Sequence, residues 1–202
     1  MIWEDVGFLL KKSNFSENSI IAQFFTKNHG KTSGIIYGGT SRKVKNYLQV
    51  GNKLKLIYKS KSIEKIGYFT TEIIDVNSAI HFDNKNILLC IQSACYFLFT
   101  LLPENEKNYE IYKNTEELFK NLKEKNWIAD YIYWERMLIK ELGFEVDVKN
   151  ETFSYNKNKE LSKTSIFSAL DYNKNLLFSY FFTPNKIDFS FERNCLENYY
   201  KK

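Results

Sequence analysis

Basic side chains gather in one stretch of this chain, between residues 31 and 65. The stretch carries nine lysines and arginines against one acid, Glu64. Ammonium and guanidinium groups neutralise phosphates and release counterions, so a face built from them binds nucleic acid with an affinity that falls as salt rises. The predicted DNA-binding residues are Lys31, Arg42, Lys43, Lys45, Lys53, Lys55, Lys59 and Lys61. The alternative interpretation is a solvated surface without a ligand.

Tyrosines are interleaved with these cations, namely Tyr37, Tyr47, Tyr58 and Tyr68. An exposed tyrosine ring can stack on an unpaired base, which is worth about 1–3 kcal/mol per base. We single out Tyr37 and Tyr47 for base stacking, whereas Tyr58 alternates with apolar residues and is expected in the core. For each of these rings, a place in the hydrophobic core is the alternative.

The basic excess is confined to the first part of the chain. The whole chain has a net charge of +5. Residues 1–78 carry 12 basic and 6 acidic residues, and residues 79–202 carry 17 and 18, so their net charges are +6 and −1. A general bias towards lysine would affect both parts equally. The asymmetry therefore favours a polyanion as the partner of the first part.

Residues that hold metals or form disulfides are few. The cysteines Cys90, Cys95 and Cys195 form no C-x-x-C pair, and neither His29 nor His81 has a second ligand at a usable spacing. Cys90 and Cys95 lie in an apolar run and are expected as buried thiols. We predict no metal and no cofactor.

The motifs of known catalytic sites are also missing from the sequence. There is no G-x-S-x-G, P-loop, H-E-x-x-H or dinucleotide-binding glycine pattern. Glu135 and Glu141 are six residues apart on one expected helix, so they do not share a face and are expected to be surface charges. The sequence predicts a protein that is not an enzyme and has no catalytic residue.

The longest apolar run, residues 87–102, is interrupted by Gln92 and Ser93 and is short for a bilayer span. The first residues lack the basic-then-apolar pattern of a signal peptide. We expect a cytoplasmic, nucleoid-associated protein.

The elements that must position the basic stretch alternate like β-strands. Expected strands cover Val6 to Leu10 with an end at Lys11-Lys12, then residues 20–26, 31–37, 53–59 and 66–74. A tight turn is expected at Asn28-His29-Gly30 and a mobile basic loop at residues 38–46. Five short strands and one long loop predict an OB-fold barrel over residues 1–78.

Helical spacing replaces strand alternation over residues 79–202, so the fold class is α+β with a helical C-terminal domain. Expected helices run from a cap at Asp83 or Asn84 to Leu102, from Asn114-Thr115 onwards, over residues 127–142 with Gly143 as the C-terminal cap, and over residues 164–182 and 191–200. Residues 150–163 are polar and predict a loop.

Short motifs follow one another in an order typical of one known family. The first part contains residues 7–12 (GFLLKK), 17–21 (ENSII) and 25–34 (FTKNHGKTSG), and the second part contains residues 101–104 (LLPE), 134–144 (WERMLIKELGF), Asp147 and Arg193. Through these motifs, which extend over nearly the whole chain, it resembles the bacterial RecO family of recombination mediators in DNA repair.

The resemblance implies an N-terminal OB-fold, a helical domain, binding of single- and double-stranded DNA, and annealing of complementary strands. It also implies partnership with RecR in loading RecA onto DNA coated by single-strand-binding protein (SSB), and binding to the acidic C-terminal tail of SSB. Two alternatives remain open from the residues themselves: an RNA-binding OB-fold protein, and a scaffold that binds only proteins.

The chain departs from the family pattern at one place. Many RecO relatives carry a four-cysteine zinc module just after the position of Asp147, whereas residues 148–163 of this chain contain no cysteine. We expect this module to be reduced or lost, and no zinc to be bound.

Overall fold

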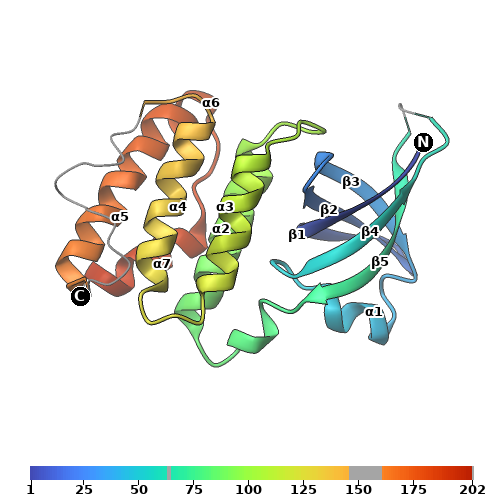
Figure 1. Ribbon diagram of the computed structural model, residues 1–202, viewed down its shortest axis with the longest axis horizontal. Helices are drawn as coiled ribbons and strands as arrows, with labels where there is room; N and C mark the ends of the chain where they lie inside the picture. Colours follow the sequence, from blue (N-terminus) through green and yellow to red (C-terminus); the bar gives the residue numbers. More distant parts are fainter. Residues whose placement is uncertain (63–64, 146–160, 202) are drawn as a thin grey trace. The chain divides into compact units, whose positions relative to one another are not determined.

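A computed structural model describes residues 1–62, 65–145 and 161–201 (Figure 1). The chain forms two compact units, Met1–Tyr109 and Glu110–Lys202, which are described separately below. The predicted domain boundary at residue 78 separates strands from helices, whereas the first compact unit also contains the first long helix.

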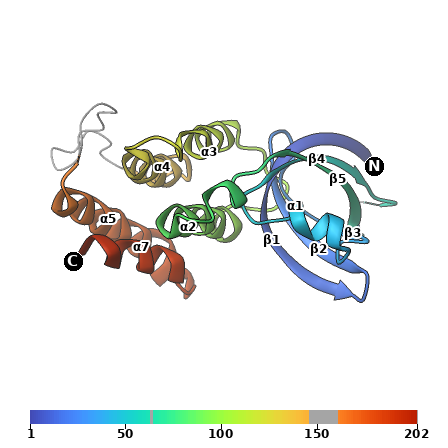
Figure 2. The same ribbon diagram turned by 90° about the horizontal axis from the view of Figure 1, so that it is seen from below.

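The first unit is built on a closed five-stranded barrel. Its strands are β1 (Ile2–Ser16), β2 (Ser19–Thr26), β3 (Gly30–Tyr37), β4 (Lys53–Lys59) and β5 (Gly67–Asp75), in the spatial order β1-β2-β3-β5-β4. All neighbours are antiparallel except β3 and β5. A short helix, α1 (Arg42–Tyr47), connects β3 to β4 at one end of the barrel (Figures 1 and 2). A five-stranded barrel of this kind is the OB architecture, so the predicted fold class is confirmed.

The barrel interior follows the predicted alternation. Leu54, Leu56 and Tyr58 are buried in the core, and the alternating residues Lys53, Lys55, Ile57 and Lys59 lie on the opposite face of the strand. Two local expectations were wrong. β1 does not end at Lys11-Lys12, because it remains paired with β2 as far as Ser16. The expected mobile loop contains α1, because Val44 and Tyr47, three residues apart, pack on the core from one helical face.

The helix α2 (Lys85–Leu101) completes the first unit, after a single 3₁₀ turn, η1 (Ala79–His81). Asn84 caps it, as predicted, by accepting a hydrogen bond from the Ile87 amide at 3.2 Å. α2 packs against β1 and β2. Cys90 and Cys95 are fully buried within it, which confirms their expected place in the core.

The second unit is helical. Its elements are α3 (Tyr109–Asn121), α4 (Trp127–Glu141), α5 (Lys163–Leu177), the π-helical turn η2 (Phe178–Phe182), α6 (Thr183–Asn185) and α7 (Phe191–Lys201). Gly143 has a φ of +93°, as a glycine after a helix end should. α3 begins five residues before the expected start at Asn114. Most of the expected loop at 150–163 lies outside the described residues.

A buried ion-pair network joins α4, α5 and α7. The Arg193 guanidinium donates to Glu135 at 2.5 and 3.3 Å, to Glu197 at 3.0 Å and to the Leu170 carbonyl at 2.7 Å. Asn173 donates a further hydrogen bond to Glu135 at 3.0 Å. Glu135 is fully buried, so the expectation of a surface charge was wrong. Sequence spacing along α4 does not reveal a partner 58 residues away.

No helix within the described residues has the length and apolar character needed to cross a membrane.

Candidate nucleic-acid interface

The outer surface of β1, β2, β3 and β5 carries a patch without a carboxylate. Side chains alternate between the two faces of a strand, so residues paired with one another across these strands share the outer face. Lys11 pairs with Gln23, Gln23 with Ser33, and Ile35 with Tyr68. We call the outer-face patch the set Lys11, Ser13, Ile21, Gln23, Ser33, Tyr37 and Tyr68, together with the exposed Phe15, which lies at a register shift between β1 and β2. The Lys11 ammonium borders α2, where it lies 4.4 Å from the centroid of the Phe99 ring.

Three aromatic rings of the outer-face patch are open to solvent. Phe15 is 56% exposed, Tyr37 66% and Tyr68 38%. The ring centroids of Tyr37 and Tyr68 lie 5.9 Å apart and the ring planes are tilted by 56°, so the two rings adjoin on one surface, which we call the aromatic platform. Aromatic side chains are normally kept out of water, and exposed rings of this kind are the surfaces on which unpaired bases stack.

Polar and basic groups adjoin this aromatic platform. Gln23 donates to the Ser33 hydroxyl at 2.9 Å, so both side chains lie on the same surface. Lys59 is paired with Tyr68 across β4 and β5, and Lys61 follows it in the connection between these strands. In OB-folds, the face of strands 2 and 3 and the loops after strands 1 and 4 bind oligonucleotides. The patch therefore combines stacking surface, hydrogen-bonding groups and cations where this fold binds nucleic acid.

Lys31 is placed elsewhere. It is buried, with an exposed fraction of 7%, and its ammonium donates to the Phe99 carbonyl of α2 at 2.7 Å. The Glu104 carboxylate lies 3.6 Å from the same nitrogen. Because this cation already has partners inside the first unit, we leave Lys31 out of the candidate interface.

Lys53 and Lys55 lie among acids on the outer surface of β4. The Lys55 ammonium is 3.5 Å from Glu4, and Glu72 is its neighbour on β5. Lys53 is paired in register with Asp75. These carboxylates offset the lysine charges, so this surface attracts phosphates less than the patch beside Tyr68.

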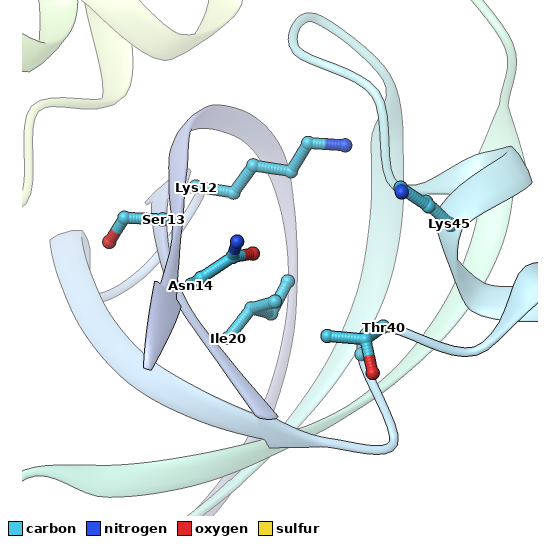
Figure 3. A pocket seen from close by; sticks show the side chains of 7 residues that line it. Lys12, Ser13, Asn14, Ile20, Thr40 and Lys45 are labelled. Atoms are coloured by element: carbon cyan, nitrogen blue, oxygen red, sulfur yellow. The ribbon is translucent and has the colours of Figure 1, made fainter. Parts of the chain in front are cut away.

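The basic residues of α1 divide between two places. Arg42 and Lys43 are exposed. Lys45 lines a pocket of about 410 Å³ at the end of the barrel, together with Lys12, Asn14, Ile20, Gly39 and Thr40. We call this the end pocket. Figure 3 shows the ammonium groups of Lys12 and Lys45 directed into the same space.

The two tyrosines chosen for base stacking differ in exposure. Tyr37 belongs to the outer-face patch. Tyr47 is partly buried against the barrel core, and its hydroxyl lies 3.0 Å from the Thr71 hydroxyl and 3.2 Å from the Thr71 carbonyl oxygen. Tyr58 is in the core, as expected, and accepts a hydrogen bond from the Gly67 amide at 3.0 Å. Tyr37 is therefore the one of the two chosen tyrosines that offers a free face.

Sequence reasoning did not select Lys11, Phe15 or Tyr68 for the interface. A signal existed for Phe15, which is a large apolar residue in the polar run Ser13-Asn14-Phe15-Ser16. Tyr68 was one of the tyrosines interleaved with the cations, but its contact with Tyr37 was not predictable, because it depends on a parallel pairing of β3 and β5 between residues that are far apart in sequence.

A polar cluster holds the turn between β2 and β3. The buried Asp5 carboxylate accepts hydrogen bonds from the amides of Val6 and Asn28, each at 2.8 Å, and lies 2.9 Å from Nδ1 of His29. The His29 ring stacks on Trp3, with centroids 4.0 Å apart. Burial raises the pKa of Asp5, but the hydrogen bonds from His29, Asn28 and Val6 outweigh it and leave this pKa below its ordinary value.

Metal ligands do not converge in the parts of the chain that the structure describes. No group of three or more His, Cys, Asp or Glu side chains there could hold an ion. The position of the zinc module found in relatives falls largely within residues 146–160, outside the described ranges.

Comparison with known proteins identifies close sequence relatives. The family model "Recombination protein O N terminal" matches residues 1–77, and "Recombination protein O C terminal" matches residues 86–171. "DNA repair protein RecO" of Ehrlichia chaffeensis is 30% identical over 223 aligned positions, covering 100% of this chain and 90% of the relative.

Two further relatives of the same name align with shorter segments. The protein of Cereibacter sphaeroides is 33% identical over 146 residues, and that of Roseobacter denitrificans is 32% identical over 145 residues. The alignments cover 72% and 71% of this chain, and 61% and 60% of the relatives. The chain thus spans about three fifths of the length of these two relatives.

Proposed function

Because the chain belongs to the RecO family, we propose that it is a DNA-binding recombination mediator in DNA repair. It acts by binding single- and double-stranded DNA and by annealing complementary strands, and it makes or breaks no covalent bond itself. The observation that carries the DNA-binding part of this proposal is the outer-face patch, in which exposed rings adjoin cations on an OB-fold barrel.

In this proposal, the exposed tyrosines of the barrel bind the bases and its basic side chains bind the phosphates. Tyr37 and Tyr68 stack on unpaired bases, which is largely independent of base sequence because every base has a π-face. Lys59, Lys61, Arg42 and Lys43 neutralise phosphates. Two complementary strands repel each other through their phosphates, so partial neutralisation of one strand lowers the cost of bringing the second strand close enough to pair.

The partners of the protein in this proposal are those of the RecO family. The protein acts with RecR to load RecA onto single-stranded DNA coated by SSB, and it binds the acidic C-terminal tail of SSB. The family matches over residues 1–77 and 86–171 support this assignment. Binding of purified RecR and of a synthetic SSB tail peptide, measured by calorimetry, tests the two contacts separately.

A fluorescence-anisotropy titration of single-stranded DNA at several salt concentrations tests the binding surface. Each phosphate contact on a single strand contributes about 0.7 to the slope of log affinity against log salt. The variant Lys59→Gln/Lys61→Gln should therefore flatten the slope by up to about 1.4. Lys53→Gln/Lys55→Gln is the matched control and should change the slope less, because acids neighbour both lysines. A larger effect of the control variant would move the binding surface to the side of β4 that carries Lys53 and Lys55.

Base stacking needs a separate variant. Tyr37→Ala/Tyr68→Ala should weaken binding of single-stranded DNA about 5- to 150-fold, from about 1–3 kcal/mol per stacked base, and leave the salt slope unchanged. Tyr199→Ala removes a ring that is 49% exposed in the second unit and serves as the control. Equal affinity of the double variant and the unchanged protein would contradict the aromatic platform.

Two competing functions give different results in the same assay. Strong preference for RNA over DNA of one sequence would favour an RNA-binding OB-fold protein. Absence of any salt-dependent affinity for nucleic acid would favour a scaffold that binds only proteins.

A further inference from the structure

The end pocket holds two cations that face each other. Lys12 belongs to β1 and Lys45 to α1, and Figure 3 shows their ammonium groups converging while the Asn14 side chain reaches into the same space. The Lys12 ammonium donates to the Leu48 carbonyl at 2.5 Å, which anchors it beside the end of α1. The fold therefore holds one cation in place and brings a second one to it.

Neither cation is neutralised within the described part of the chain. No carboxylate there forms an ion pair with Lys12 or Lys45. Burial and, second, the positive charge of Lys45 lower the pKa of Lys12 below its ordinary value. The two ammonium groups repel each other, which costs free energy. An anion bound between them would be attracted by both and would offset this repulsion.

We propose that the end pocket is a subsite for a phosphate monoester, namely the terminal phosphate of the DNA strand that lies along the outer-face patch. The proposal extends the DNA-binding function proposed above and depends on it. The pocket would thereby give the protein a preference for strands that end in a phosphate.

The charge of the pocket matches a terminal phosphate better than an internal one. A phosphate monoester carries about −1.5 to −2 charges at pH 7, close to the two positive charges of Lys12 and Lys45. An internal phosphodiester carries a single negative charge and is followed by further chain on both sides. A pocket set into the end of the barrel suits a group that is attached to the strand on one side.

The position of the end pocket also suits a strand end. Gly38 and Gly39 connect Tyr37 of the outer-face patch to Thr40 of the pocket, and Phe15 of the patch directly follows Asn14 of the pocket. The Thr40 hydroxyl donates to the Glu17 carbonyl at 2.9 Å and ties this turn to the β1–β2 connection. The outer-face patch and the end pocket are therefore adjacent along the chain at two places, and the proposal requires a strand stacked on Tyr37 to direct its terminal phosphate into the pocket.

The test compares oligonucleotides of one sequence that end in a 5′-phosphate, a 3′-phosphate or hydroxyls only, by fluorescence anisotropy at constant ionic strength. One phosphorylated end should bind about 3- to 10-fold tighter than the hydroxyl end, as expected for partly exposed charge pairs. Lys45→Gln and Lys12→Gln should each remove this preference. Lys43→Gln, at an exposed lysine of the same helix, is the matched control: it should weaken the binding of all three oligonucleotides alike and keep the preference.

Each failure has its own signature. Equal affinity for phosphorylated and hydroxyl ends, with DNA binding intact, would overturn the terminal-phosphate subsite and leave the proposed function standing. If the unchanged protein bound none of the three oligonucleotides, this result would instead contradict the proposed function. Lys45→Gln guards against a folding defect in Lys12→Gln, because Lys45 is exposed and its side chain is not anchored to a carbonyl as that of Lys12 is.

A second measurement separates the strand end from free phosphate. Inorganic phosphate and thymidine 5′-monophosphate are titrated into the full chain while the amide signals of Thr40 and Lys45 are followed by NMR, with chloride at matched ionic strength as the control. Saturable shifts of these two amides support an anion subsite. Shifts with inorganic phosphate but no end preference in DNA would assign the pocket to a free anion and overturn the strand-end assignment.

Discussion

Removal of the buried Arg193 guanidinium should be the most damaging single change in the helical unit. Arg193 and Glu135 are both fully buried, and they form two hydrogen bonds with each other. Burial alone would lower the pKa of Arg193, but the charge and hydrogen bond of Glu135, together with the charges of Tyr131 and Glu197, outweigh it and raise this pKa above its ordinary value. The guanidinium is therefore held in its charged form by its carboxylate partners.

The size of the effect follows from the charges that remain. Two unit charges about 4 Å apart attract by about 4 kcal/mol at an effective dielectric constant of 20. Loss of one partner of a buried pair costs about 3–5 kcal/mol, because the other charge remains desolvated. We expect Arg193→Met to lower the free energy of unfolding by about this amount. Arg193→Met combined with Glu135→Leu should recover much of the loss, because it removes both members of the fully buried pair while Glu197 keeps Lys174 as a partner.

Urea unfolding followed by tryptophan fluorescence measures the change. Trp127 and Trp134 belong to the second unit and Trp3 to the first, so a Trp3→Phe background reports the second unit alone. Lys174→Met is the control, because this lysine is partly exposed and lies 3.2 Å from Glu197, a setting usually worth less than about 1 kcal/mol. An equally small loss for Arg193→Met would refute the argument from burial.

Three further changes address the first unit. Asp5→Asn should lower the free energy of unfolding of this unit by about 1.5–3 kcal/mol at pH 7. Because the pKa of Asp5 in the folded protein is lowered, the difference from the unchanged protein should shrink as pH falls below the ordinary aspartate pKa of 3.8. Urea unfolding at several pH values measures this difference. Gly30→Ala should lower the melting temperature more than Gly38→Ala: both glycines have positive φ, but only at Gly30 would the new Cβ collide with backbone, 2.1 Å from the Glu106 carbonyl oxygen. Lys31→Met should cost about 1–3 kcal/mol by leaving the Phe99 carbonyl without its donor, with an unchanged salt slope of DNA binding; a flatter slope would return Lys31 to the interface.

Periodicity along the chain determined the secondary structure with few errors. Leu54, Leu56 and Tyr58 alternate with other residues, mostly lysines, and this period of two predicts one buried face, whatever that face packs against. Gly143 ends its helix because glycine adopts positive φ without strain. The loop predicted in place of α1 was inferred from the charge of residues 38–46 and not from their spacing. The spacing of Val44 and Tyr47, three residues apart, already indicated a helical face.

The residue types along the chain did not determine which charged side chains would be buried with a partner and which would lie on the surface. Lys31 and Lys59 look alike in sequence, since each lies at one end of a strand within the basic stretch. Lys31 donates to a carbonyl of α2, whereas Lys59 is paired with Tyr68 across β4 and β5, beside the candidate interface. Similarly, Glu135 became an internal charge through α7, which follows it by more than fifty residues.

Strand register and helix packing thus decided the candidate site. Local pattern is a property of neighbouring residues, and it predicts which side chains leave water. The sharing of one surface by Tyr37 and Tyr68, and of one pocket by Lys12 and Lys45, depends on which strand pairs with which and at what offset. Those pairings are chosen by the packing of the whole barrel, because a shift of one residue would turn every side chain of a strand to the opposite face.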